Sequence, residues 1–222
     1  MELKLGENKT VTITPWKSKT KKEFIKLFKK KEDKVDEQDI IDVLILPYID
    51  NTEVYYSPDE IQYILIKLRE ISITDEINFS MDCDNKECGK NFDIETNLGN
   101  ISSYQPNKYP TELNNVTWRD LPAKDSLTKM IKKYPDEPPR SISMILHIET
   151  INGELISSFQ QLINIVDDLS MRDADDLERD YNLVSSKLDI KQNIKCTHCG
   201  FEKEYLFDII PTFFDPLLPK DM

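Results

Sequence analysis

The sequence predicts an α+β protein in which two β-hairpins, each with a pair of cysteines at its turn, join a mainly helical body. The first observation is a pair of short motifs, CDNKECG at 83–89 and CTHCG at 196–200, which hold all four cysteines of the chain. The second is the alternation of apolar and polar residues on both sides of each motif, which is typical of hairpin strands. The third is a set of segments with helical periodicity before and between the motifs.

The composition excludes some classes of protein. The chain has 222 residues and a formal charge of −12, with 41 acidic residues against 29 basic ones. This length supports a buried core in one large domain or two small ones, and a chain this acidic repels nucleic-acid phosphates overall. No apolar segment of leader length follows Met1, and no run of about 18 apolar residues occurs. We therefore expect the protein to remain in a cytosol, where thiols stay reduced.

Residues 1–72 are predicted to form a short strand followed by helices. Within residues 17–34, Phe24, Leu27 and Phe28 fall on one helical face, while nine lysines and three acids occupy the segment. This helix is either a docking element for an acidic partner or, as is commoner for such a pattern, an amphipathic helix whose lysines face water.

Two further apolar segments complete this part. Residues 40–46 predict an apolar helix or strand that ends at Pro47. The clearest helix signal in the chain is SPDEIQYILIKLREIS, where Ser57 can act as N-cap, Pro58 suits the first helical position and Glu60 closes a capping box. The apolar positions that we expect this helix to bury are Ile61, Ile64, Leu65 and Leu68.

The remaining chain is predicted to contain two hairpins that flank an insertion. EINFSMDC and KNFDIETNL predict a first hairpin in residues 73–100, and LDIKQNIKC and FEKEYLFDI predict a second in 188–210. Residues 101–187 are predicted to be a helical insertion that begins with a proline- and asparagine-rich connector at 104–122. An apolar tail punctuated by prolines, residues 211–222, follows the second hairpin.

The last helix of the insertion has its own start signal, because Ser170 with Asp173 can cap it. We expect its apolar side to face inward and most of its acids to face outward. The predicted inward residues are Ala174, Leu177, Tyr181 and Val184, and the outward ones are Asp175, Asp176, Glu178 and Asp180.

The four cysteines predict a shared metal site. Four residues separate Cys83 from Cys88 and two separate Cys196 from Cys199, and both spacings occur in structural zinc sites. The glycine after each pair permits the positive φ of a tight turn whose amides point at the thiolates. Two thiolates cannot complete a tetrahedral site, so we expect both loops to hold one structural zinc ion, as in a zinc ribbon split into two halves. The predicted role of the ion is architectural, since structural zinc contributes to folding free energy.

Three other interpretations of the cysteines stay open. A redox dithiol at Cys196 and Cys199 requires a thioredoxin-like βαβ setting, whereas the flanking residues predict a hairpin. Iron in a rubredoxin-like site has the same sulfur geometry, and two unrelated buried pairs need no metal. His198 lies inside the second loop and could compete as a ligand, but with four thiolates present we expect it to face solvent.

No catalytic constellation is apparent, and we predict that the protein is not an enzyme. His147, in the apolar run ISMILHIET, is expected to be a core or half-buried residue. We find no glycine-rich phosphate loop, nucleophile elbow or paired-histidine metal motif. The acidic cluster DDLSMRDADD spreads its carboxylates around a helix, which favours capping and solvation over a divalent-ion site.

The order of these features resembles a known family. A TPW strand leads to KKEFIKLF, EIQYILIKLREISI leads into the first cysteine loop, and IKCTHCGFEKEYLFDIIPTFF ends the chain. Over residues 10–214 this order is similar to the baseplate hub subunits and hub assembly proteins of T-even-like contractile-tailed bacteriophages. The resemblance implies a non-enzymatic structural or assembly protein, found in the infected host cytoplasm and in the virion tail baseplate. It also implies that the four cysteines are the metal site, although the first pair in that family is more often separated by two residues.

The partners that the resemblance implies are other phage tail proteins, with no small-molecule substrate, no membrane and no nucleic acid. The C-terminal tail is expected either to dock in a partner groove as an extended segment or to fold back on its own domain. An alternative function is a zinc-ribbon adaptor that binds nucleic acid or a polymerase, because fold alone does not fix function. The candidate partner-binding residues of the tail are Phe213, Phe214, Leu217 and Leu218.

Overall fold

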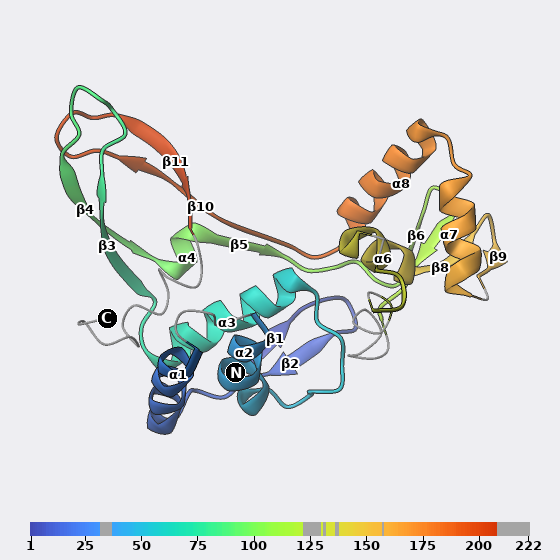
Figure 1. Cartoon of the computed structure of the whole chain (residues 1–222), viewed down its shortest axis with the longest axis horizontal. Helices are drawn as coiled ribbons and strands as arrows, with labels where there is room; N and C mark the ends of the chain where they lie inside the picture. The colour runs from blue at the N-terminus through green and yellow to red at the C-terminus, as the bar shows by residue number, and fades with distance from the viewer. Residues whose placement is uncertain (32–36, 122–129, 131, 136–137, 157, 208–222) are drawn as a thin grey trace.

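The protein has three parts, which we name the N-terminal unit, the arm and the distal unit (Figure 1). The arm and the distal unit extend from the N-terminal unit in different directions. A computed structural model describes residues 1–31, 37–121, 130, 132–135, 138–156 and 158–207.

The N-terminal unit combines a small hairpin with helices. The apolar segment at 40–46 is helical throughout, and Pro47 lies inside a short 3-10 helix at its end. Phe24 is fully buried and Leu27 half-buried, whereas the side chain of Phe28 lies outside the described residues. The elements are β1 (Glu2–Lys4), β2 (Thr10–Thr12), α1 (Ser18–Lys31), α2 (Glu37–Ile40), η1 (Ile41–Ile45), η2 (Leu46–Tyr48) and α3 (Pro58–Ser72).

The predicted capping box of α3 is confirmed. The Ser57 hydroxyl accepts a hydrogen bond from the Glu60 backbone N–H at 3.3 Å, and Ser57 N–H donates to the Glu60 carboxylate at 2.7 Å. This reciprocal pair satisfies two backbone donors at the helix start. Ile64, Leu65 and Leu68 are buried as expected and anchor α3 in the core, whereas Ile61, also predicted to be buried, is half-buried at the edge of that core.

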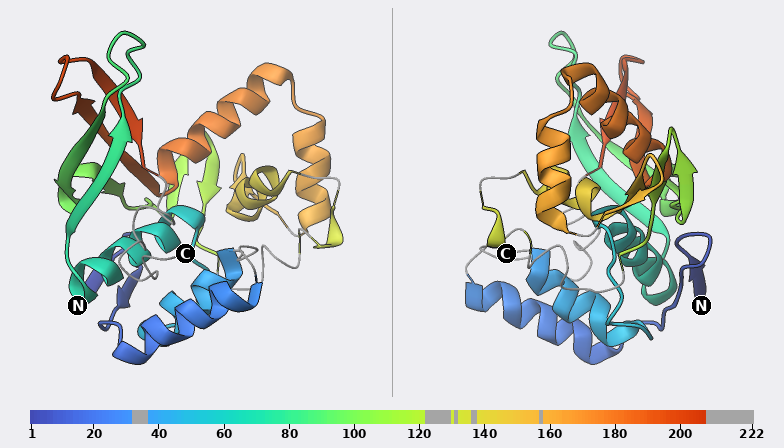
Figure 2. Two further views of the ribbon diagram at one scale, coloured as in Figure 1. Left: turned by 60° about the vertical axis from the view of Figure 1, so that its left-hand side comes forward. Right: turned by 90° about the vertical axis from the view of Figure 1, so that its right-hand side faces the viewer.

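The arm consists of two antiparallel hairpins whose turns carry the cysteine motifs, as the alternation predicts. They lie side by side in both views of Figure 2 and in Figure 1. The strand β10 is long enough to pair with β11 near the cysteines and with β5 at its other end. The elements are β3 (Glu76–Asp82) with β4 (Asn91–Asn97), α4 (Leu98–Ile101), β5 (Ser102–Gln105), and β10 (Lys187–Lys195) with β11 (Glu202–Leu206).

The distal unit is more mixed than the predicted helical insertion. The connector at 104–122 and the segment at 148–155 supply strands, and β6 to β9 form a four-stranded antiparallel sheet beside helices. These strands are two to four residues long, so their alternation is too brief to be distinguished from loop or helix. The elements are β6 (Thr111–Leu113), β7 (Val116–Trp118), α6 (Pro139–Leu146), β8 (Ile148–Ile151), β9 (Glu154–Leu155), α7 (Phe159–Asp167) and α8 (Met171–Val184).

The helix α8 begins as predicted, with Ser170 Oγ accepting from Asp173 N–H at 3.2 Å. Leu177 and Val184 are buried, and Ala174 and Tyr181 are half-buried. The outward prediction for Asp180 is wrong. Its side chain is only 3% exposed, because it accepts a hydrogen bond from the Asn114 side chain at 2.8 Å on the turn between β6 and β7.

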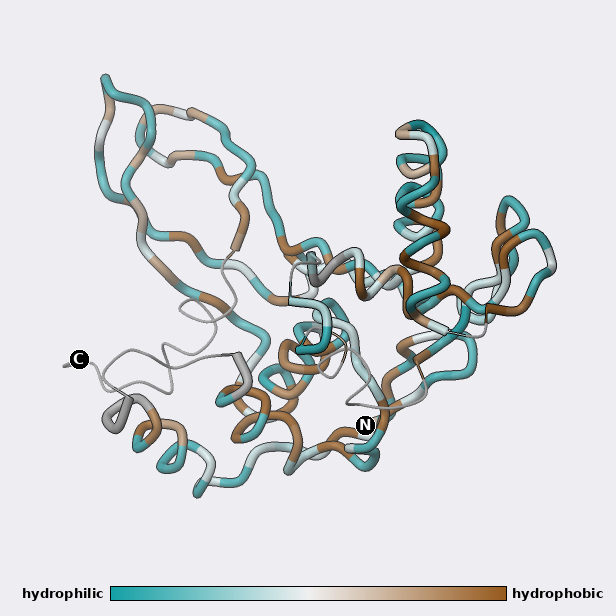
Figure 3. The backbone as a smooth tube through the Cα atoms, turned by 45° about the vertical axis from the view of Figure 1, so that its right-hand side comes forward, coloured by the Kyte–Doolittle hydropathy of each residue, from teal (hydrophilic) through white to brown (hydrophobic). Residues whose placement is uncertain are grey.

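Two hydrophobic cores hold these parts. The first core begins in the N-terminal unit and continues along the arm as far as Cys83 and Cys196. The second core belongs to the distal unit and centres on Trp118, Ile145 and Ile148. Figure 3 shows that the arm is hydrophilic over most of its length, with only short hydrophobic stretches. Among the described residues, no helix has both the length and the apolar character needed to cross a lipid bilayer.

Candidate metal centre

Both cysteine loops close by the same backbone plan. In the first loop, Cys83 N–H donates to the Lys90 carbonyl at 3.0 Å, and Gly89 N–H donates to the Asn85 carbonyl at 2.9 Å. Gly89 has φ +52°, a left-handed conformation that glycine adopts without strain.

The second loop repeats this arrangement with fewer residues. Cys196 N–H donates to the Phe201 carbonyl at 2.8 Å, and Gly200 N–H donates to the Cys196 carbonyl at 2.9 Å. Gly200 has φ +74°. The two loops are therefore matching turns that present cysteines at the ends of two hairpins.

The structure brings together all four sulfurs that the sequence singles out. The four Sγ atoms lie within 4.8 Å of one another. Cys83 and Cys199 are 3.6 Å apart and Cys88 and Cys196 are 3.9 Å apart, so both short distances join one hairpin to the other. A tetrahedral site with Zn–S bonds of about 2.3 Å has S···S edges of about 3.8 Å. All four cysteines are free thiols at these distances, so the geometry fits one tetrahedral ion.

Backbone amides surround these sulfurs. Asn85 N–H donates to Cys83, and His198 N–H and Cys199 N–H donate to Cys196. Burial raises the pKa of Cys83 to about 12. Burial also opposes ionisation of Cys196, but hydrogen bonds from the two amides and from neighbouring thiols outweigh it and lower the pKa of Cys196 to about 6. Cys196 therefore ionises more readily than Cys83, and a divalent cation would supply the charge needed to hold four thiolates together.

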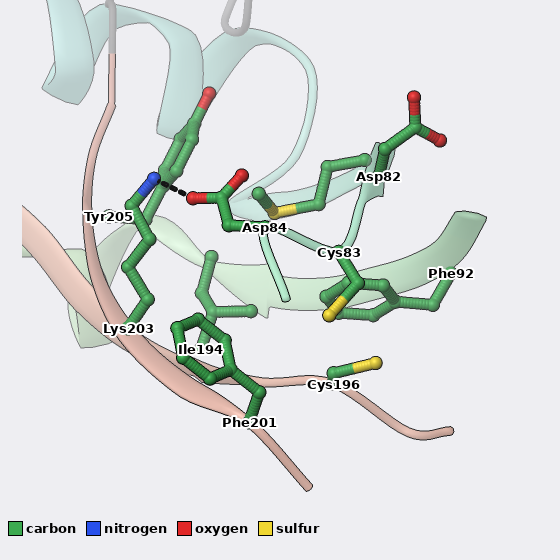
Figure 4. A pocket seen from close by; sticks show the side chains of 10 residues that line it. Asp82, Cys83, Asp84, Phe92, Ile194, Cys196, Phe201, Lys203 and Tyr205 are labelled. Atoms are coloured by element: carbon green, nitrogen blue, oxygen red, sulfur yellow. Dashed lines mark hydrogen bonds and ion pairs between the residues drawn. The ribbon is translucent and has the colours of Figure 1, made fainter. Parts of the chain in front are cut away.

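Polar contacts tie the two loops together around the sulfurs. His198 is exposed, as expected, and its Nε2 lies 3.1 Å from the carbonyl of Asn91 in the first hairpin. Lys203 forms an ion pair with Asp84 across the two hairpins. Figure 4 shows Cys83 and Cys196 on the same side of the small pocket between the hairpins, away from this ion pair.

Aromatic residues pack between the two hairpins. Phe79 of the first hairpin packs against Tyr205 and Phe207 of the second, with ring centroids 5.7 and 5.5 Å apart. The pocket between the hairpins retains only about 10 Å³ of free space, too little for a small-molecule substrate. A complete set of four thiolates also leaves no open coordination position, so the geometry suits a structural ion rather than a catalytic one.

The other candidate residues fall in different places. His147 is buried, stacks on Tyr109 at 4.6 Å between ring centroids, and has Nδ1 2.8 Å from the Arg119 carbonyl. Burial lowers the pKa of His147 to about 4, so it is a neutral core residue at physiological pH. The carboxylates of α8 form no converging metal-binding group within the described ranges. The candidate partner-binding residues Phe213, Phe214, Leu217 and Leu218 lie outside the described residues.

A buried carboxylate at the junction of the N-terminal and distal units was not predicted. Glu60, only 1% exposed, forms an ion pair with Lys9 at 2.7 Å and accepts a hydrogen bond from Asn107 at 2.9 Å. Burial raises its pKa, and Lys9 opposes that shift. The capping box places Glu60 at a helix start but carries no signal of these long-range partners, which lie 51 and 47 residues away.

The chain was also compared with known proteins. A family model described as T4 bacteriophage base plate protein matches residues 1–215. No curated protein and no solved structure matches the chain.

Proposed function

Because the chain belongs to the T4 bacteriophage base plate protein family, we propose that it is a non-enzymatic structural or assembly protein of the baseplate hub that acts through protein–protein contacts. Its place would be the infected host cytoplasm during assembly and the virion tail baseplate, and its partners other tail proteins. We further propose that Cys83, Cys88, Cys196 and Cys199 hold one structural zinc ion. On this account residues 73–100 and 188–210 are the two halves of a zinc ribbon.

The observation that supports the metal site is the convergence of thiols from two hairpins at the edge lengths of a tetrahedron. The 107 residues between Cys88 and Cys196 would then form a loop whose ends the ion joins. When bound, the ion supplies positive charge that neutralises the thiolates and fixes their spacing. The protein supplies the amides that orient the sulfurs and the contact of His198 with Asn91 that aligns the two loops.

Elemental analysis of the purified full chain tests this site. We expect about one zinc per chain, because four thiolates complete a tetrahedral site. Cys196→Ser should abolish stoichiometric zinc, whereas His198→Ala in the same loop should keep it, since His198 is not among the converging ligands. One iron per chain would show that the metal is misassigned, and a wild-type chain without metal would contradict the site.

The hub assignment has a separate test. Affinity purification of the tagged full chain from infected cells should recover other tail proteins. Replacing Phe213, Phe214, Leu217 and Leu218 with serine should reduce that recovery, because we propose that the apolar tail contacts a partner. Recovery of RNA polymerase alone would contradict the hub role and support the adaptor alternative.

The charge of the arm does not favour that adaptor alternative. Three lysines of the second hairpin pair with acids, in Lys191–Glu204, Lys195–Glu202 and Lys203–Asp84. Such pairing leaves no basic stripe along this hairpin for a phosphate backbone. We accordingly expect no DNA binding by the full chain even at low salt, and a steep salt-dependent affinity would contradict this expectation.

A further inference from the structure

A groove with an apolar floor and an acidic rim lies between α6, α7 and α8 of the distal unit. Its free volume is about 300 Å³. Met144 of α6, Val166 of α7 and Ala174 of α8 contribute apolar surface to it, and Asp175 and Glu178 of α8 contribute carboxylates. The groove is thus large enough for one or two long side chains of a neighbouring helix.

The groove continues along α8. Ala174, Glu178 and Tyr181 line it at helical spacing, and Met171 lies one turn before Ala174 on the same side. Met171 is 86% exposed, so its apolar side chain adds accessible surface at the start of α8. The groove and Met171 together give α8 an accessible surface with both apolar and acidic side chains over residues 171–181.

The complementary surface in this chain is the exposed side of α1. Lys19, Lys22 and Lys26 are exposed there at i, i+3 and i+7, so they form one stripe along the helix. Phe24 on the opposite side is fully buried, which anchors α1 to its own core and presents the lysines outward. Figures 1 and 2 show α1 and α8 at opposite ends of the molecule, so the two stripes cannot meet within one chain.

We propose that α1 of one copy of this protein docks against the groove and acidic stripe of α8 on the next copy. The aliphatic stems of the lysines cover the apolar floor, and their ammonium groups reach Asp175 and Glu178 at the rim. The two surfaces differ, so the contact is head-to-tail, and repetition closes a ring or extends a filament. The chain's charge of −12 opposes association elsewhere on the surface, and this makes the contact weak and sensitive to salt.

Charge reversal provides a test with a built-in rescue. Sedimentation equilibrium of the full chain at low salt should show species larger than the 26.0 kDa monomer, which dissociate at high salt as the charges are screened. Asp175→Lys with Glu178→Lys should be monomeric, and so should Lys22→Glu with Lys26→Glu. An equimolar mixture of these two double variants should associate again, because each supplies the surface that complements the other.

Matched controls separate the contact from net charge. Glu95→Lys with Glu204→Lys and Lys4→Glu with Lys191→Glu change the net charge equally on exposed sites away from α1 and α8, and both should associate like the wild type. A wild-type chain that is monomeric at all concentrations would overturn the proposal, as would association that survives either reversal or a mixture that stays monomeric. None of these positions is a cysteine, so zinc content should remain unchanged and the metal proposal is tested independently.

Discussion

The arm and the distal unit differ in the interactions that stabilise them. The arm consists of two hairpins whose residues are mostly hydrophilic (Figure 3). The four cysteines lie in the turns of these hairpins. The distal unit wraps helices and a small sheet around its own apolar core, with Trp118 and Ile148 completely buried. A two-stranded hairpin is marginal in water without further packing. On the proposed metal site, we therefore expect the arm to depend on the ion for its order and the distal unit not to.

The two regions are nevertheless connected. The strand β10 follows α8 directly, and Lys108 N–H donates to the Val184 carbonyl at 2.8 Å beside that connection. The strand β10 is therefore the route by which loss of order in the arm would reach the distal unit.

The largest expected effect of a single substitution outside the cysteines is in the distal core. Trp118→Ala should lower the free energy of unfolding of the distal unit by about 3–5 kcal/mol, because it leaves a large cavity. Hydrogen exchange resolved by region should accelerate in α6 to α8, while zinc per chain stays unchanged. Trp118→Phe is the control and should cost much less. Its ring fills most of the space, and Trp118 Nε1 has no hydrogen-bond partner within the described part of the chain.

Zinc loss in Trp118→Ala would contradict this independence. It would show that the distal core supports the cysteine loops through β10, so that the two regions are not independent.

A smaller effect follows from pH in the distal unit. Burial lowers the pKa of His147 from 6.5 to about 4, so protonation favours the unfolded state. Neutral His147 makes its full contribution to the free energy of unfolding above pH 6.5. That contribution declines as pH falls towards 4, by up to about 3 kcal/mol. In His147→Phe, the stability of the distal unit should decline less between pH 7 and pH 5. The measurement is urea unfolding of the full chain at each pH, with hydrogen exchange used to report on each region separately. Equal pH dependence in variant and wild type would contradict the assignment of His147 as the titrating group.

The smallest effect concerns the ion pairs of the arm. Lys203→Met removes the pair with Asp84 between the hairpins, and Lys191→Met removes the pair with Glu204 within one hairpin. Both pairs are about half exposed, so each variant should cost only about 0.2–1 kcal/mol, and less at high salt. Zinc affinity should stay close to wild type in both. A large loss of affinity in Lys203→Met alone would mean that the ion pair, and not the metal, aligns the hairpins.

Much of the arm could be predicted from the sequence, because its signals are local. The alternation around each cysteine motif predicts the hairpins, and the structure confirms them. The convergence of the two cysteine pairs follows from coordination chemistry, since two thiolates cannot complete a tetrahedral site. The capping signals at Ser57 and Ser170 likewise depend only on residues three positions away.

The sheet of the distal unit was not predicted, although two turn signals exist. Asn114 and Asn115 have φ of 51° and 66° between β6 and β7, and Asn152 and Gly153 have φ of 53° and 77° between β8 and β9. Asn-Gly in particular is a strong hairpin signal. The strands beside these turns are too short to show alternation, so helical periodicity dominated the prediction.

Long-range polar partners could not be predicted at all. Glu60 serves both in a local cap and in a buried junction with Lys9, and only the first role has a local pattern. Asp180 lies three residues after Leu177 and four before Val184, so helical spacing places it beside the buried side of α8. Its charge favoured an outward prediction, yet Asn114 from a distant turn covers it. Such partners depend on how separate elements pack together, which no spacing rule encodes.

The most direct test of the metal clasp is hydrogen exchange of the full-length chain, measured region by region before and after zinc removal by a strong chelator. The account predicts faster exchange in residues 76–97 and 187–206, with little change in 139–146 and 159–184, and recovery when zinc is returned. Exchange in the two hairpins that is unaffected by metal removal would contradict it.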